Sequence, residues 1–370
     1  MHNPCILCRP RAILKTNEIG DLDAVSPKEA RTTYLHSEKI SLDVLVMQEL
    51  FGVGDANMNA IEQGLAVSIS TRGGYVDVSG EEKNVTLALE TLRTLEKMHK
   101  NGEPINDFAV SRAIELVREG KGDAMVDAMK DTIAIAHNGT PIKCRTIGQR
   151  AYVDAMRKNT VTICIGPAGT GKTYLAVAAV VGMLKRKEIE RIVMCRPAVE
   201  AGEKLGFLPG DLQNKVDPYL RPLYDALDEL LGHETVQRYI ENRVIEIAPL
   251  AYMRGRTLKN AGCLIDECQN MTLVSHKLIL TRLGEGSRMI LTGDVTQIDL
   301  PAGTESGLAK CADLLSDIEG IGVVRLNSRD VIRHKLVGQI VKAFDKYEGQ
   351  KKEKKPPRGD KYRFRKAGGK

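Results

Sequence analysis

The sequence has no apolar run long enough to cross a membrane. Its longest such run, residues 175–184, falls far short of the roughly 20 residues that a membrane-spanning helix needs. The apolar stretch Cys5 to Leu7 is too short to be the core of a signal peptide. These two absences exclude membrane and secreted proteins and predict a cytoplasmic location.

Cysteine pairs with the spacing of metal ligands are also scarce. The eight cysteines are scattered, and several lie in strand-like apolar runs, as reduced thiols of cytosolic proteins do. Only Cys5 and Cys8 have metal-like spacing, and no second Cys or His pair follows at zinc-finger distance. We interpret residues 1–33 as a flexible leader, with a metal site at this cysteine pair as the less favoured alternative.

Outside the last twenty residues the chain has no net positive charge. The chain has a net charge of +6, whereas residues 351–370 contain ten Lys and Arg and two acidic residues, a net +8, which leaves −2 for residues 1–350. This composition cannot form a core, so residues 349–370 are predicted to be a disordered tail. Such a tail can contact RNA phosphates, with Tyr362 and Phe364 stacking on bases, or it can serve solubility alone.

The length of 370 residues leaves room for about two or three domains. Residues 34–100 have the first compact pattern. Apolar spacing predicts a strand at 40–42, helices at 44–51 and 56–63, a hairpin from 66–70 and 75–78, and a helix at 85–98. This order is that of a KH-type RNA-binding module, whose Gly-x-x-Gly loop joins the first two helices. Here that loop reads Gly52-Val53-Gly54-Asp55, with the second glycine misplaced. RNA binding and a purely structural or oligomerising α+β unit both remain open.

Residues 101–140 are interpreted as a polar, helical connector. From there onward, strands alternate with helices, and residues 141–348 are assigned to one domain. Six apolar strands are predicted, at 161–165, 191–195, 244–247, 263–266, 289–292 and 323–326. Such alternation predicts an α/β fold with a parallel sheet and helices on both faces.

A phosphate-binding loop follows the first of these strands. It reads Gly166-Pro167-Ala168-Gly169-Thr170-Gly171-Lys172-Thr173 and matches G-x-x-x-x-G-K-[S/T] at every fixed position. The backbone N–H groups of such a loop face a phosphate chain, and the helix that follows adds partial positive charge. Lys172 is predicted to reach the β and γ phosphates of ATP, and the Thr173 hydroxyl to hold Mg²⁺.

Four further residues are predicted to complete the site. Asp266 ends an apolar strand and is expected to bind Mg²⁺, and the adjacent Glu267 to act as general base toward the attacking water. Gln297 follows the next strand and suits a contact with the γ-phosphate. Gln149 lies upstream of the loop, and its amide can pair with the adenine edge.

Several further motifs, taken together, resemble those of one known protein family. They are Arg196-Pro197 with Glu200, Leu205 to Asp211, Pro218 to Pro222, Arg254 to Leu258, Asp266 to Asn270, Gly293-Asp294 with Gln297, and Val331 to His334. Together with the P-loop, this set resembles the PhoH-like family over about residues 145–342, and residues 34–100 look like its N-terminal KH-type domain. This sequence has Cys268 where the family usually has alanine, and residues 1–33 resemble no segment of the family.

The resemblance implies a RecA-like P-loop ATPase related to superfamily 1 helicases and associated with RNA metabolism and phosphate starvation. The first interpretation is therefore an RNA helicase or translocase-like ATPase. The alternative is an ATP-dependent regulatory or assembly factor that controls a partner, for example an endoribonuclease, without unwinding. A kinase is disfavoured by the Asp266-Glu267 pair, because water activation would waste ATP.

A homo-oligomer, in the form of a ring, is also predicted. Superfamily 1 helicases place ATP between two tandem cores, and the second core supplies an arginine to the γ-phosphate. Here one core ends near Ala343, and too few residues follow to form another. A neighbouring copy can supply that arginine through a head-to-tail contact. Arg333 is the leading candidate, ahead of Arg282 and Arg329, and a surface salt bridge is the alternative role for Arg333.

Overall fold

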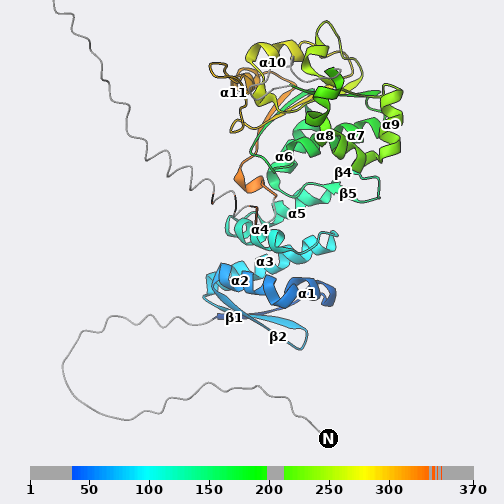
Figure 1. The fold of residues 1–370 in the computed structure, drawn as a ribbon. Helices are drawn as coiled ribbons and strands as arrows, with labels where there is room; N and C mark the ends of the chain where they lie inside the picture. Colours follow the sequence, from blue (N-terminus) through cyan, green and yellow to red (C-terminus); the bar gives the residue numbers. More distant parts are fainter. Residues whose placement is uncertain (1–35, 198–211, 333–335, 338–339, 341–342, 344–370) are drawn as a thin grey trace, which may run out of the picture.

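The structure, a computed structural model, describes residues 36–197, 212–332, 336–337, 340 and 343. Figure 1 shows an N-terminal unit in blue and cyan and a C-terminal unit in green to orange. The predictions for Cys5 and Cys8, for residues 205–211, for Arg333 and for the tail lie outside the described residues. Within the described part of the chain, no helix is long and apolar enough to cross a membrane.

The N-terminal unit has the element order predicted from the sequence. Its elements are β1 (His36–Ser41), α1 (Val44–Phe51), α2 (Ala56–Leu65), β2 (Val67–Arg72), β3 (Tyr75–Gly80) and α3 (Glu82–Lys100). The sheet has the order β1-β3-β2, and both pairings are antiparallel. Asp43 begins α1 by accepting a hydrogen bond from the Leu45 N–H. A small α+β domain is therefore present, and its KH-type identity stays a prediction.

The loop between α1 and α2 contains a short 3-10 helix, η1 (Val53–Asp55). Gly52, Gly54 and Asp55 all have positive φ angles, of 68°, 63° and 58°. Asp55 stands where a Gly-x-x-Gly loop has its second glycine, and aspartate tolerates this left-handed conformation better than most side chains. The backbone therefore accommodates the replacement, and the carboxylate adds negative charge to this loop.

The segment predicted as a connector is not a separate linker. Helices α4 (Asp107–Arg118) and α5 (Gly122–Lys130) pack into the same apolar core as α1 to α3. The apolar stripe of α4, which includes Ala113 and Leu116, is buried there, because an amphipathic helix must cover its apolar face. The hairpin β4 (Thr132–Ile135) and β5 (Pro141–Lys143) follows, and β4 contacts α7 of the C-terminal unit.

All six strands predicted for the C-terminal unit are present. They are β6 (Val161–Ile165), β7 (Arg191–Arg196), β8 (Ile245–Pro249), β9 (Ala261–Ile265), β10 (Arg288–Gly293) and β11 (Ile321–Arg325). The strands are parallel and have the order β11-β6-β10-β9-β7-β8. Strand β10 thus lies between β6, which precedes the P-loop, and β9, which precedes the acid pair.

Helices cover both faces of this sheet. On one face lie α6 (Ile147–Lys158), α7 (Lys172–Lys185), α8 (Leu212–Leu231) and α9 (His233–Glu241), and on the other lie α10 (Leu273–Leu280) and α11 (Leu308–Leu315). Alternate strand residues enter the two cores. Ile290, for example, joins the first core, whereas Met289 and Leu291 join the second. The predicted α/β fold class is therefore confirmed.

Candidate nucleotide-binding site

The P-loop connects the carboxyl end of β6 to the first turn of α7. Gly169 and Gly171 have φ angles of 84° and 77°, a conformation that favours glycine. Gly166 packs so closely on Leu326 that an added Cβ would lie 2.7 Å from the Leu326 Cβ. These glycines allow the loop to curl at the amino end of a helix, which is the arrangement that binds phosphate.

Lys172 is held against the loop from which it comes. Its ammonium donates to the carbonyl oxygens of Gly166, at 2.6 Å, and Pro167, at 2.9 Å. Burial lowers the pKa of Lys172, and the charge of Asp294 partly opposes this. Phosphate oxygens are stronger acceptors for an ammonium than neutral carbonyl oxygens are, so a phosphate chain can replace these contacts.

Asp266 directly follows β9, which is separated from β6 by β10 alone, and it contacts the end of the P-loop directly. The Asp266 Oδ1 atom accepts hydrogen bonds from Thr173 Oγ1, at 2.7 Å, and from Thr292 Oγ1, at 2.6 Å. This carboxylate is buried. Hydroxyl and carboxylate oxygens are the ligands that Mg²⁺ prefers, so Thr173 and Asp266 fit the predicted metal site.

Glu267 has both carboxylate oxygens occupied by hydrogen bonds. Oε1 accepts from Arg196 Nη2 at 2.8 Å, and Oε2 accepts from Gln269 Nε2. Its backbone is left-handed, with φ 55° and ψ 38°, and such a conformation costs roughly 1–3 kcal/mol in a residue other than glycine. The surrounding contacts therefore fix the direction of this side chain.

The loop after β10 is connected to the acid pair through Gln269. The Gln269 Oε1 atom accepts the N–H of Asp294 at 3.0 Å. Asp294 Oδ1 in turn accepts from the N–H and the hydroxyl of Thr296, whereas its Oδ2 is buried with no hydrogen-bond partner. From the sequence, Asp294 was named only as part of the Gly293-Asp294 motif, with no role assigned, and Thr292 was not singled out, although it is a polar residue in β10.

A cleft of about 510 Å³ joins these elements. Among the predicted site residues, Lys172, Thr173, Asp266, Glu267 and Gln297 line it, as do Ala168, Gly169 and Gly171. The rest of its lining comes from α7, α8 and the ends of β7 and β10, namely Tyr174, Arg196, Pro222, Asp225, Ala226, Glu229, Gly293 and Asp294. The structure therefore brings together the P-loop, the acid pair and Gln297 as the sequence predicted.

Gln149 does not line this cleft. It lies in the first turn of α6, behind the P-loop, and is buried. Its Nε2 donates to the carbonyl oxygen of Thr170 at 2.9 Å, and its Oε1 accepts the N–H of Arg145 at 2.7 Å. These contacts show that Gln149 braces the P-loop, and its contact with adenine stays a prediction.

Three arginines near the C-terminal unit contact other groups of their own chain. Arg329 pairs with Glu115 of α4 and with Glu119 directly after it, Arg256 pairs with Glu246, and Arg282 donates to the carbonyl oxygens of Leu278 and Arg256. None of the three lines the cleft. Arg196 does line it, and from the sequence this residue was named only as part of the Arg196-Pro197 motif, with no role assigned.

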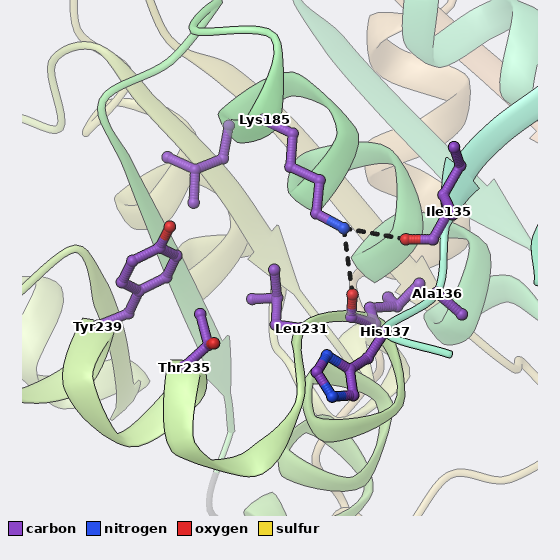
Figure 2. A pocket seen from close by; sticks show the side chains of 9 residues that line it. Ile135, Ala136, His137, Lys185, Leu231, Thr235 and Tyr239 are labelled. Carbon is purple, nitrogen blue, oxygen red and sulfur yellow. Dashed lines mark hydrogen bonds between the residues drawn. The ribbon is translucent and has the colours of Figure 1, made fainter. Parts of the chain in front are cut away.

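A smaller cavity of about 280 Å³ lies away from the P-loop, between β4, α7, α8 and α9 (Figure 2). Its only lysine, Lys185, donates to the carbonyl oxygens of Ile135 and Leu230, at 2.9 and 3.2 Å. No residue of the P-loop or the acid pair lines it. The cleft at the P-loop is therefore the candidate nucleotide site.

Known proteins share much of the sequence of this chain. Residues 141–345 match the family model described as PhoH-like protein. A PhoH-like protein of Bacillus subtilis (strain 168) is 48% identical over 297 residues, which cover 80% of this chain and 93% of that protein. A PhoH-like protein of Mycobacterium tuberculosis (strain ATCC 25618 / H37Rv) is 43% identical over 335 residues, 90% of this chain and 94% of that protein.

Similarity to solved structures is low. The Sulfolobus solfataricus SWI2/SNF2 ATPase core in complex with dsDNA is 16% identical, has a TM-score of 0.31, and covers 48% of this chain and 43% of that chain. A similarity at this level supports no conclusion about function.

Proposed function

This chain belongs to the PhoH-like protein family, and from that premise we propose that it is a cytoplasmic ATPase of RNA metabolism that hydrolyses ATP to ADP and phosphate. The proposal rests chiefly on one observation. Lys172, Thr173, Asp266, Glu267 and Gln297, from three loops distant in the sequence, line one cleft. A phosphate-binding loop with an acid pair opposite it is suited to hydrolysis, since it offers a phosphate site and a base for water.

The chemistry follows from the positions of these side chains. Glu267 accepts a proton from a water molecule while the water oxygen forms a bond to the γ-phosphorus. The bond between that phosphorus and the oxygen bridging to the β-phosphate breaks, and ADP leaves with the bond electrons. Lys172 stabilises the charge on the phosphate oxygens, and Gln297, which lines the same cleft, is proposed to contact the γ-phosphate. Mg²⁺ held by Thr173 and Asp266 would neutralise further phosphate charge.

RNA is proposed as the partner, and residues 351–370 as its main contact. Their net charge of +8 suits the phosphate backbone, whereas Asp55 adds negative charge to the loop that a KH-type domain would use. We favour an assembly that translocates or unwinds RNA. The alternative is an ATP-dependent factor that controls an RNA-processing partner such as an endoribonuclease.

An ATP-turnover assay with and without RNA tests this proposal. We expect magnesium-dependent release of phosphate that single-stranded or duplex RNA stimulates, and no release from Lys172→Ala, which lacks the phosphate-binding ammonium. Turnover equal in the variant and the unmodified protein would contradict the assigned site. A duplex-unwinding assay on the same samples separates the helicase from the regulatory factor.

A further inference from the structure

Arg196 occupies the wall of the cleft opposite the P-loop. It ends β7, which is separated from β6 by β9 and β10, and its guanidinium lies 2.8 Å from Glu267 Oε1. Both side chains are partly buried, with exposed fractions of 19% for Arg196 and 31% for Glu267. The pair therefore faces the space in which a terminal phosphate and an attacking water would meet.

The cleft is acidic for a site that binds an anion. Among its described lining residues, only Lys172 and Arg196 carry a positive charge. Five carry a negative charge, namely Asp225, Glu229, Asp266, Glu267 and Asp294. Lys172 lies at the P-loop wall, so Arg196 is the one described cation of the lining on the opposite wall. A triphosphate that extends across the cleft would meet its guanidinium last, at the γ-phosphate.

A carboxylate has about four lone-pair sites, and Glu267 can take a proton from water only at a site that no other donor occupies or shields. In the structure, Arg196 and Gln269 each donate to one of its two oxygens. A guanidinium has five N–H donors in a planar fork that fits two phosphate oxygens at once. A γ-phosphate can therefore compete with Glu267 for the same guanidinium, whereas ADP has no group at that position.

We propose that Arg196 is a switch between Glu267 and the γ-phosphate. Without ATP, it holds Glu267 by an ion pair. With ATP bound, its guanidinium donates to the γ-phosphate oxygens, and Oε1 of Glu267 is left to accept a hydrogen bond from water. One rotation of Arg196 thus senses the γ-phosphate and frees the base. This inference rests on the proposed ATPase function.

The test is the affinity for ATP relative to ADP. Isothermal titration of Arg196→Ala with the β,γ-imido analogue of ATP and with ADP, both with Mg²⁺, separates a γ-phosphate contact from a general loss of binding. Loss of a charge-assisted hydrogen bond corresponds to about 10- to 100-fold in affinity. We expect that loss for the analogue and less than about threefold for ADP. Turnover should fall about 10³-fold, the lower range for an arginine at a transferred phosphoryl group.

Two further variants serve as controls. Arg191→Ala removes the arginine at the other end of β7, outside the cleft, and should leave both affinities unchanged. Arg196→Lys keeps the charge and the packing but not the fork, so it should fold as the unmodified protein does and give an intermediate affinity for the analogue. Circular dichroism and thermal unfolding check that the variants are folded.

Several outcomes would overturn the inference. If Arg196→Ala and Arg196→Lys keep the full preference for the analogue over ADP, Arg196 does not contact the γ-phosphate. If Arg196→Ala turns over ATP faster than the unmodified protein, the arginine only restrains Glu267. A protein that binds the analogue through Arg196 without hydrolysing ATP would contradict the proposed function alone, and one that binds neither nucleotide would contradict both.

Discussion

Lys172 and Glu267 act at different stages of the proposed cycle, because one binds phosphate and the other acts only when water attacks. Lys172 contacts the P-loop itself, whereas Glu267 lies on the other side of β10 and is held by Arg196 and Gln269. Loss of the ammonium should therefore prevent binding, and loss of the carboxylate charge should not.

Glu267→Gln should keep ATP bound and slow its hydrolysis by roughly 10²- to 10⁴-fold, the range for a positioned acid or base. The amide has the shape of the carboxylate but cannot take the proton from water. Nucleotide titration and single-turnover hydrolysis of the same sample measure the two effects, and Lys172→Ala provides the contrast of lost binding. Turnover close to that of the unmodified protein would remove Glu267 from the role of base.

Gln149→Ala should destabilise the chain by about 1–3 kcal/mol, since it leaves the buried carbonyl group of Thr170 and the partly buried N–H group of Arg145 without these partners. Urea unfolding measures this change. The predicted contact with adenine requires, in addition, that the variant lose its preference for ATP over GTP. A preference that stays unchanged would leave Gln149 with the bracing role alone.

At the scale of elements, the short helix η4 (Ser328–Asp330, orange in Figure 1) belongs to the C-terminal unit and also contacts the N-terminal unit. Asp330 is buried and accepts from the Thr146 hydroxyl at 2.7 Å and from the Asn327 N–H at 3.0 Å. Two residues later, the Ile332 N–H donates to the Gly169 carbonyl of the P-loop at 2.9 Å. Arg329 of the same helix pairs with Glu115 of α4 and with Glu119 directly after that helix.

Asp330→Ala should therefore lower both stability and nucleotide affinity. Removal of a buried acceptor leaves the hydrogen of the Thr146 hydroxyl without an acceptor, at a cost of about 1–3 kcal/mol, and loosens the segment that supports Gly169. Urea unfolding and titration with ADP measure the two effects. Arg329→Ala is the matched control on the same helix, and its half-exposed ion pairs should matter little to either quantity. Equal effects of the two substitutions would show that the buried contacts of Asp330 do not support the P-loop.

Removal of residues 351–370 should weaken RNA binding equally for all sequences and flatten its dependence on salt, because phosphate contacts release counterions. ATP turnover without RNA should change little. Fluorescence anisotropy of labelled RNA at several salt concentrations measures the slope. If the slope is the same with and without these residues, they do not bind RNA phosphates.

For the whole molecule, the described residues contain one parallel sheet of the P-loop type, and in the predicted ring a neighbouring copy would supply the second core. Arg282 and Arg329 are already engaged by groups of their own chain. Arg333 lies outside the described residues and stays, as a prediction, the leading candidate for the arginine that such a copy would supply.

A mixture of Lys172→Ala and Arg333→Ala subunits, each inactive alone, should recover part of the ATP turnover. Some interfaces then pair an intact P-loop with an intact arginine, and an arginine in trans contributes about 10³- to 10⁵-fold in rate. Turnover at several mixing ratios, together with light scattering, tests this. A fully active monomer would contradict the ring.

The candidate site residues and the strands of the C-terminal unit could be predicted from the sequence because short, local residue patterns mark them. The P-loop needs glycines, a lysine and a threonine at fixed spacing, and it lies between β6 and α7 as the pattern required. Asp266 and Glu267 were predictable as acids at the end of an apolar strand. Apolar runs likewise predicted all six strands, because strands buried on both faces are continuously apolar.

Only the tertiary structure decided which strand ends lie together. The insertion of β10 between β6 and β9 brings Thr292 to Asp266, and the pairing of β7 with β9 brings Arg196 to Glu267. The packing of α4 and α5 against α3, and the burial of Gln149 behind the P-loop, were decided in the same way. Strand order and helix packing depend on contacts between residues far apart in the chain, which local patterns of apolar and polar residues do not specify.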